Sequence, residues 1–68
     1  MAEKLKNKDY DLISILYNAS QAVETCSIYV KDAEKDGDRE AKQFFNEVVE
    51  LNSNLIHKGK ELLKTRLQ

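Results

Sequence analysis

The fold is decided by one stretch of sequence, Lys31-Asp32-Ala33-Glu34-Lys35-Asp36-Gly37-Asp38-Arg39-Glu40. Gly37 reaches positive φ at no steric cost, which suits the position just past the end of a helix. Asp38 follows, and its short carboxylate can accept hydrogen bonds from the backbone amides that open the next helix. Glu40 adds negative charge to that first turn, where the helix dipole favours it. The stretch therefore predicts two helices folded back on each other as a hairpin.

Apolar residues recur at helical spacing on both sides of this turn. The predicted helices run from a cap at Asp9 or Asn7 to about Lys35, and from Arg39 to about Arg66. The rows that carry the pattern are Leu12, Ala19, Cys26 and Ala33 in the first helix, and Ala41, Val48, Leu55 and Leu62 in the second. We expect an all-α chain with a flexible N-terminal tail over residues 1–8 and one helical hairpin domain over residues 9–68.

Composition excludes several classes of protein. Eleven basic residues balance twelve acidic ones, so the chain has no electrostatic footprint for nucleic acid or for an anionic membrane surface. No apolar run has the ~20 residues that a membrane span needs, and the first residues contain no hydrophobic signal region. Cys26 is alone, which suits a reducing compartment. We expect a soluble cytoplasmic protein without a cofactor.

The apolar pattern is too wide for one hairpin to bury. A single core of this size supplies about 3–5 kcal/mol, and neither a disulfide nor a zinc site is available to add to it. Two hairpins packed face to face would bury the excess, so we expect a homodimeric four-helix bundle. The residues expected between the two chains are Phe44, Phe45, Val49, Ile56 and Leu63.

The turn also fixes a register. With its centre at Gly37, facing residues have numbers that add to about 74, as in any antiparallel helical hairpin. This register pairs Cys26 with Val48 and Ala19 with Leu55, so we expect the row through Leu55 and Leu62 to face the first helix. It also sets Glu24 level with Glu50, and Tyr17 level with His57. Gly59, inside the second helix, either allows a close approach to Leu16 or is simply tolerated at a cost of about 1 kcal/mol.

Several short runs of this sequence resemble those of a known family of helical proteins. The runs Leu12-Ile13, Leu16-Tyr17, Glu24, the turn, and Phe44-Phe45-Asn46-Glu47-Val48-Val49-Glu50 resemble one half of a ferritin-like, rubrerythrin-type bundle. They are more similar still to short hairpin proteins of that type found in photosynthetic bacteria, whose function is unassigned. The resemblance implies that Glu24 matches the glutamate that binds metal from the first helix. It also implies that Glu50 matches the glutamate of the Glu-x-x-His motif of the second helix.

The histidine of that motif is Ser53 here, and His57 lies a full turn too far along. A di-iron site needs imidazoles beside its bridging carboxylates, and a serine hydroxyl is a poor substitute. We therefore interpret His57 as a surface residue or a hydrogen-bond partner of Tyr17, and Cys26 as a small core residue.

Two hypotheses of different classes follow. In the first, the chain is a small non-catalytic structural or protein-interaction module that acts as a homodimer and docks on another protein. In the second, it is a ferritin-like carboxylate protein, degenerate or active, that binds or oxidises iron or manganese through Glu24 and Glu50.

Overall fold

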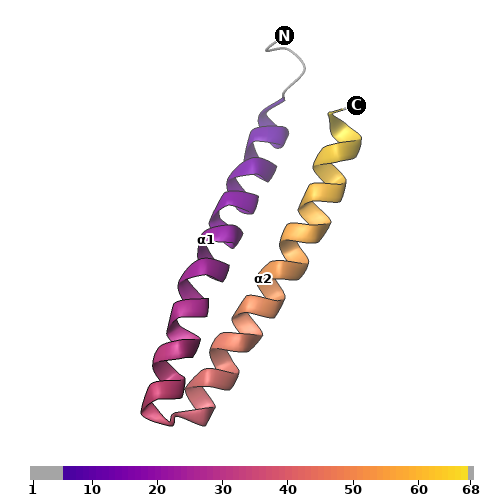
Figure 1. Ribbon diagram of the computed structural model, residues 1–68. Coiled ribbons are helices and arrows are strands. Elements are labelled where there is room, and N and C mark those ends of the chain that lie inside the picture. The colour runs from indigo at the N-terminus through magenta and orange to yellow at the C-terminus, as the bar shows by residue number, and fades with distance from the viewer. Residues whose placement is uncertain (1–5, 68) are drawn as a thin grey trace.

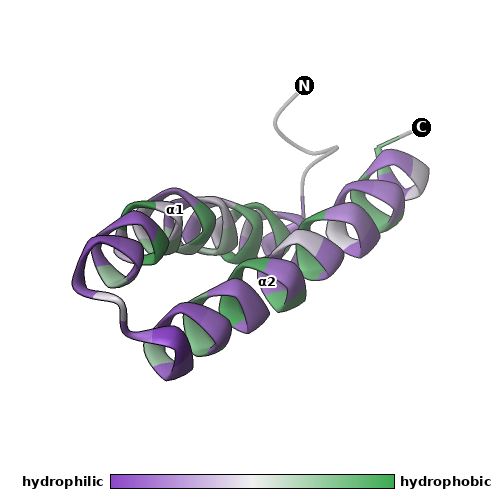
Figure 2. Cartoon of the chain, turned by 60° about the horizontal axis from the view of Figure 1, so that its bottom comes forward, coloured by the Kyte–Doolittle hydropathy of each residue, from purple (hydrophilic) through white to green (hydrophobic). Residues whose placement is uncertain are grey.

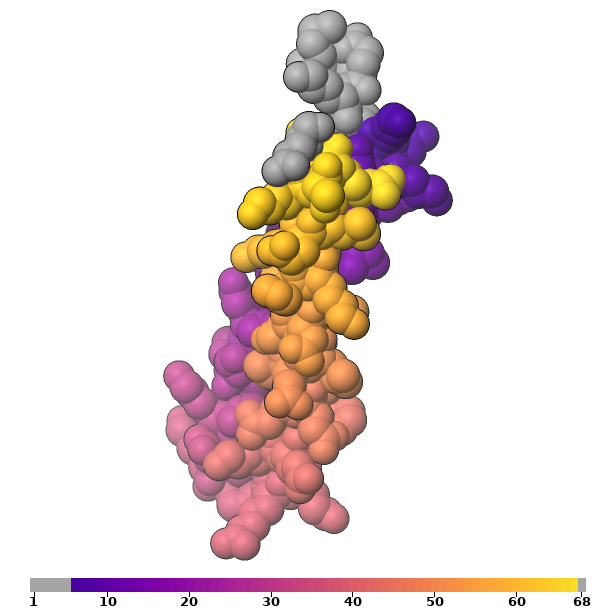
Figure 3. All heavy atoms as spheres, turned by 90° about the vertical axis from the view of Figure 1, so that its right-hand side faces the viewer, coloured from indigo at the N-terminus to yellow at the C-terminus, as the bar shows by residue number. Residues whose placement is uncertain are grey.

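The computed structural model describes residues 6–67, which form two antiparallel helices joined by a tight turn (Figure 1). Helix α1 spans Asn7–Asp36 and helix α2 spans Arg39–Arg66. The two helices lie side by side in a narrow rod of 51 × 16 × 12 Å, which Figure 3 shows with α2 in front of α1. The predicted all-α hairpin is confirmed.

The turn has the conformation that the sequence predicts. Gly37 has φ 69°, and it is the one residue of the described chain with positive φ. Its amide donates to the carbonyl of Glu34 at 3.1 Å, and the amide of Asp38 donates to the carbonyl of Ala33 at 2.9 Å. These bonds satisfy carbonyls at the end of α1 that have no partner within the helix. Asp38 Oδ1 then accepts from the amide of Ala41 at 3.0 Å, which caps the start of α2.

Helix α1 begins two residues before the predicted start of the domain, with Lys6 rather than Asp9 or Asn7 at the N-cap position. Asp9 still serves the helix start from the third helical position. Its Oδ2 accepts from the amide of Lys6 at 3.0 Å, which is the back-reaching half of a capping box. The parts of the domain prediction that concern residues 1–5 and Gln68 lie outside the described residues.

The two helices meet along a seam in which apolar residues recur at alternating spacings of three and four. This spacing is the signature of a coiled-coil contact. A Cβ atom placed on Gly59 would lie 2.5 Å from Leu16 Cδ2, so Gly59 marks the side of α2 that faces α1. The seam consists of Leu12, Leu16, Ala19, Val23, Cys26, Val30 and Ala33 on α1, and Phe45, Val49, Asn52, Ile56, Gly59 and Leu63 on α2. Figure 2 shows the apolar stripes recurring turn after turn along both helices.

The seam confirms the expectation that Gly59 permits a close approach to Leu16. It also confirms the predicted register to within one residue. The rotation of α2 differs from the expectation: the row through Leu55 and Leu62 was expected to face the first helix, but these side chains are 51% and 46% exposed. The physical reason is Gly59, because only the side of α2 without a side chain at that level can approach Leu16 closely.

Little of the hairpin is fully buried. Within the described residues, the fully buried apolar side chains are those of Ala19 and Ala33, at 4% and 6% exposure. No large side chain of residues 6–67 is completely buried. The contact between α1 and α2 therefore removes only part of the available apolar surface from water.

Candidate interaction surface

Large apolar side chains remain exposed on one broad side of the hairpin, which we call the open face. Its members follow the seam at heptad spacing on the same flank of both helices. The open face consists of the exposed Ile15 and Tyr29 on α1 and Phe44, Leu51, Leu55 and Leu62 on α2, together with the half-buried Ala22 and Val48. Phe44 and Leu51 are the most exposed, at 60% and 64%. The face is thus wider on α2, where it includes two rows of residues, than on α1, where it includes one.

The structure places these two flanks on one side of the molecule. Ile15 and Leu62, from different helices, line one shallow hollow near the open end of the hairpin. Tyr29 and Phe45 line a second hollow near the turn, with ring centroids 5.4 Å apart. Phe44 continues this aromatic group, since its ring lies edge-on to that of Phe45 at 5.9 Å. The open face therefore has a shallow hollow near each of its two ends.

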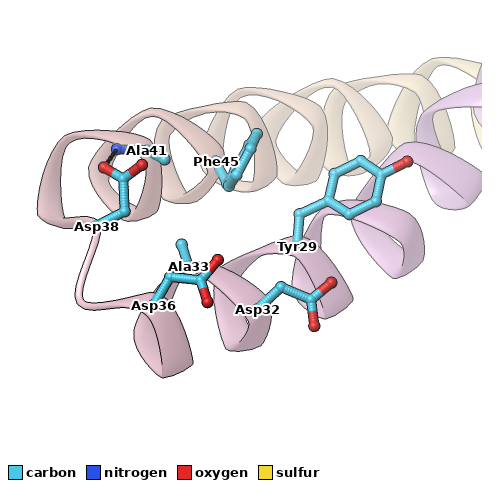
Figure 4. A pocket seen from close by; sticks show the side chains of 7 residues that line it. All are labelled: Tyr29, Asp32, Ala33, Asp36, Asp38, Ala41 and Phe45. Atoms are coloured by element: carbon cyan, nitrogen blue, oxygen red, sulfur yellow. Dashed lines mark hydrogen bonds between the residues drawn. The ribbon is translucent and has the colours of Figure 1, made fainter.

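The hollow near the turn has a volume of about 400 Å³ (Figure 4). Tyr29, Ala33, Ala41 and Phe45 supply its apolar wall, and the carboxylates of Asp32, Asp36 and Asp38 stand around its edge. Asp38 is already engaged by the amide of Ala41. The chemistry of this lining suits an apolar side chain from another molecule, surrounded by polar groups that stay in water.

Each end of the seam is closed by an ion pair. At the open end, Arg66 Nε donates to Asp9 Oδ1 at 2.9 Å, and the Asp9 side chain is only 4% exposed. The backbone hydrogen bond from Lys6 and the hydrogen bond from Arg66 hold the pKa of the Asp9 carboxyl below its usual range. This pair joins residues 57 positions apart and so fixes the ends of the two helices together.

At the turn, Lys42 Nζ lies 2.8 Å from Glu34 Oε2, with both side chains about half exposed. The hydrogen bond from Lys42 lowers the pKa of the Glu34 carboxyl.

A polar residue also lies within the seam: Asn52 Nδ2 donates to the carbonyl of Val48 on its own helix at 2.9 Å. No buried side-chain nitrogen or oxygen in residues 6–67 lacks a hydrogen-bond partner.

The candidate metal ligands lie away from the open face. Glu24 and Glu50 are both exposed, and so are Tyr17, Ser53 and His57. Their heptad positions set them on the opposite, polar side of the seam. Glu50 shares a surface hollow with Lys42, Gln43, Asn46 and Glu47, which include no imidazole. Over residues 6–67 no three His, Cys, Asp or Glu side chains cluster closely enough to hold a metal ion. Within one hairpin, these carboxylates are therefore not gathered into a metal-binding cluster.

The five residues expected between chains occupy two different environments. Phe45, Val49, Ile56 and Leu63 are half-buried in the seam against α1 of the same chain, whereas Phe44 is exposed on the open face. Sequence reasoning did not assign Ile15, Tyr29, Leu51, Leu55 and Leu62 to a surface open to a partner. The alternating spacing that passes through Gly59 could have shown which rows face α1.

Cys26 is a half-buried free thiol in the seam.

Comparison of the chain with protein-family models, with curated proteins and with solved structures gives no match. The resemblance to ferritin-like hairpins therefore rests on the quoted residues alone, and what is shown is an antiparallel hairpin of two packed helices. Neither helix of residues 6–67 has the length and apolar character needed to cross a membrane.

Proposed function

We propose that this chain is a non-catalytic helical interaction module that works as a homodimer, with two hairpins packed through their open faces into a four-helix bundle. The observation that carries the proposal is the open face itself. Its large side chains are regularly spaced for contact with another helix, and monomeric proteins seldom leave a contiguous apolar surface of this kind in water.

The exposed area supports the same proposal. The chain of 7.8 kDa exposes 5604 Å², whereas a compact folded protein of that mass exposes about 4,400 Å². The excess, about 1,200 Å², arises from the elongated shape of the whole chain, and it leaves room for the ~800 Å² that each partner contributes to a standard stable interface. Covering the open face would give the chain the core that its two buried alanines do not supply.

The alternative, a ferritin-like protein with iron or manganese, gains no support from the geometry. Packing through the open face would leave Glu24 and Glu50 on the outside of the bundle, so four carboxylates would not meet at its centre. The two hypotheses therefore predict different faces inside the dimer.

Sedimentation equilibrium at micromolar concentration tests the proposal. The wild-type chain should have twice the mass of one chain, and Leu55→Asp should yield monomers because it places a charge in the open face. Ile28→Asp is the matched control: Ile28 is an exposed apolar residue, at 60% against 51% for Leu55, on the side of α1 away from the open face. A well-folded wild-type monomer, or equal loss of the dimer in both variants, would refute the proposal.

A further inference from the structure

The apolar residues of the open face are arranged symmetrically about one level of the hairpin. On α1, Ile15 and Tyr29 lie seven positions on either side of Ala22. On α2, Leu51 and Leu55 lie two positions on either side of Ser53. Phe44 and Leu62 lie nine positions on either side of the same residue. The open-face residues of α1 are thus symmetric about Ala22, and those of α2, except Val48, fall in pairs about Ser53.

The two centres of symmetry lie at the same height. The structure pairs Leu16 with Gly59 and Asp9 with Arg66 across the seam. Counting along the antiparallel helices from either pair sets Ala22 of α1 level with Ser53 of α2. In a heptad pattern the possible centres recur every half heptad along each helix, and the centres of the two apolar sets coincide at this level.

We infer that the occupant of the open face is a second copy of this chain, related by a two-fold axis that passes at the level of Ala22 and Ser53, perpendicular to the helices. This inference rests on the proposed function and specifies its geometry. A two-fold interface uses the same patch on both subunits and requires the patch to be self-complementary under rotation. The symmetric pattern meets that requirement, whereas a different partner would impose no symmetry on the face.

The axis defines the contacts between copies. Helix α2 packs antiparallel on α2 of the second copy, with Leu51 against the partner's Leu55 and Phe44 against the partner's Leu62. On α1, Ile15 meets the partner's Tyr29, so the Ile15–Leu62 end of one open face covers the aromatic hollow of the other. A register shifted by half a heptad would leave Leu62 uncovered and bury the smaller Ala41 instead.

One pair in the open face breaks the apolar symmetry and gives a specific contact. Val48 and Lys58 lie five positions on either side of Ser53, so the axis sets Lys58 over the partner's Val48. The partner's Glu47 is then adjacent, in the acidic row Glu40, Glu47 and Glu61 that borders this part of α2. The lysine stem covers apolar surface while its ammonium pairs with that carboxylate, once on each side of the axis.

Crosslinking tests the axis in the full-length chain carrying Cys26→Ala, whose helicity is first checked by circular dichroism. Asn54→Cys adds an exposed thiol one position from the axis, so the two copies lie on neighbouring helices about 10 Å apart. A bismaleimide of that span should link them covalently. Glu40→Cys, an exposed site in the same row, is the matched control, because its two copies would lie about 40 Å apart.

A covalent dimer at position 54 and not at position 40 supports the axis. Links at both positions indicate parallel helices, and a dimer by sedimentation that links at neither indicates another face; both overturn this inference and leave the proposed dimer intact. A monomer by sedimentation overturns the proposed function as well.

A charge exchange in the native-cysteine background tests the Lys58 contact separately. Lys58→Glu should raise the dimer dissociation constant at least tenfold, and Glu47→Lys added to it should restore most of the lost affinity. Residues 47 and 58 are three turns apart on one helix, so rescue can only occur between copies. A double variant no tighter than Lys58→Glu alone would overturn the inference.

Discussion

Leu16 of α1 packs directly over the backbone of Gly59 in α2, in space that a Cβ atom at position 59 would have to share with Leu16 Cδ2 and Cγ. Gly59 costs α2 about 1 kcal/mol in helix propensity, and this contact is its structural reason. The absence of one methyl group thereby determines which side of α2 faces α1.

Gly59→Ala should therefore lower the melting temperature, although alanine is the better helix former. Forcing a methyl group into a packed seam costs about 1–3 kcal/mol, which outweighs the propensity gain. In a Leu16→Ala background the same change should raise the melting temperature, because the clash is gone. Thermal unfolding of the four chains in this double-mutant cycle measures the coupling. A Gly59→Ala effect of the same sign in both backgrounds would show that Leu16 yields without cost.

Gly37→Ala should destabilise the hairpin by about 1–2 kcal/mol through its backbone conformation alone. Gly37 has φ 69°, and a Cβ atom at this position would meet nothing within 4 Å, so no steric contact contributes. Gly37→Asn should cost less, because asparagine adopts the left-handed region more readily. Urea unfolding of both variants compares the two costs, and equal losses would argue against a conformational origin.

The ion pair between Asp9 and Arg66 should make the stability of the protein fall at acid pH. The pKa of Asp9 is lower in the folded state than in the unfolded state, where it is about 3.9. The contribution of Asp9 to the free energy of unfolding is therefore fully present above the unfolded pKa and is lost as the pH falls through the lower folded pKa. Asp9→Asn should flatten the decline of melting temperature over that acid range. Asp11→Asn, which changes an exposed carboxylate near the same end of α1, should leave the decline as it is in the wild type.

Glu24→Gln should leave the fold intact, and added iron or manganese should shift the melting temperature little. Both Glu24 and Glu50 are exposed, so each already has water around it and gains little from a cation. Elemental analysis of the purified protein, with thermal unfolding in the presence of each metal, checks this expectation. Stoichiometric metal that is lost in Glu24→Gln and in Glu50→Gln would establish the carboxylate site instead.

The sequence alone was sufficient to predict the hairpin and its register. Gly37, Asp38 and the helical periodicity on either side act locally, so a reader of the sequence can find them without knowing the packing. The rotation of α2 about its own axis was not predictable in the same way. Rows through Leu55 and through Ile56 are both apolar, and composition cannot decide between them.

What decides the rotation is a set of contacts between distant positions. The closest approach is at Gly59, and the pairs Asp9–Arg66 and Glu34–Lys42 secure the two ends of the seam. Asp9 was expected as a helix cap, and its second role as the partner of Arg66 depends on a contact between positions that are 57 apart in the chain. The open face could be identified only after α2 had been oriented by these contacts.

Because Ala19 and Ala33 are the only buried apolar residues among residues 6–67, a solitary hairpin would have little resistance to opening and would offer its backbone readily to proteases. Association would close that route of degradation. The amount of this protein that survives in a cell would then rise more steeply than its rate of synthesis. The rate at which the protein is degraded, rather than any chemistry at a site, would then indicate whether the open face is covered.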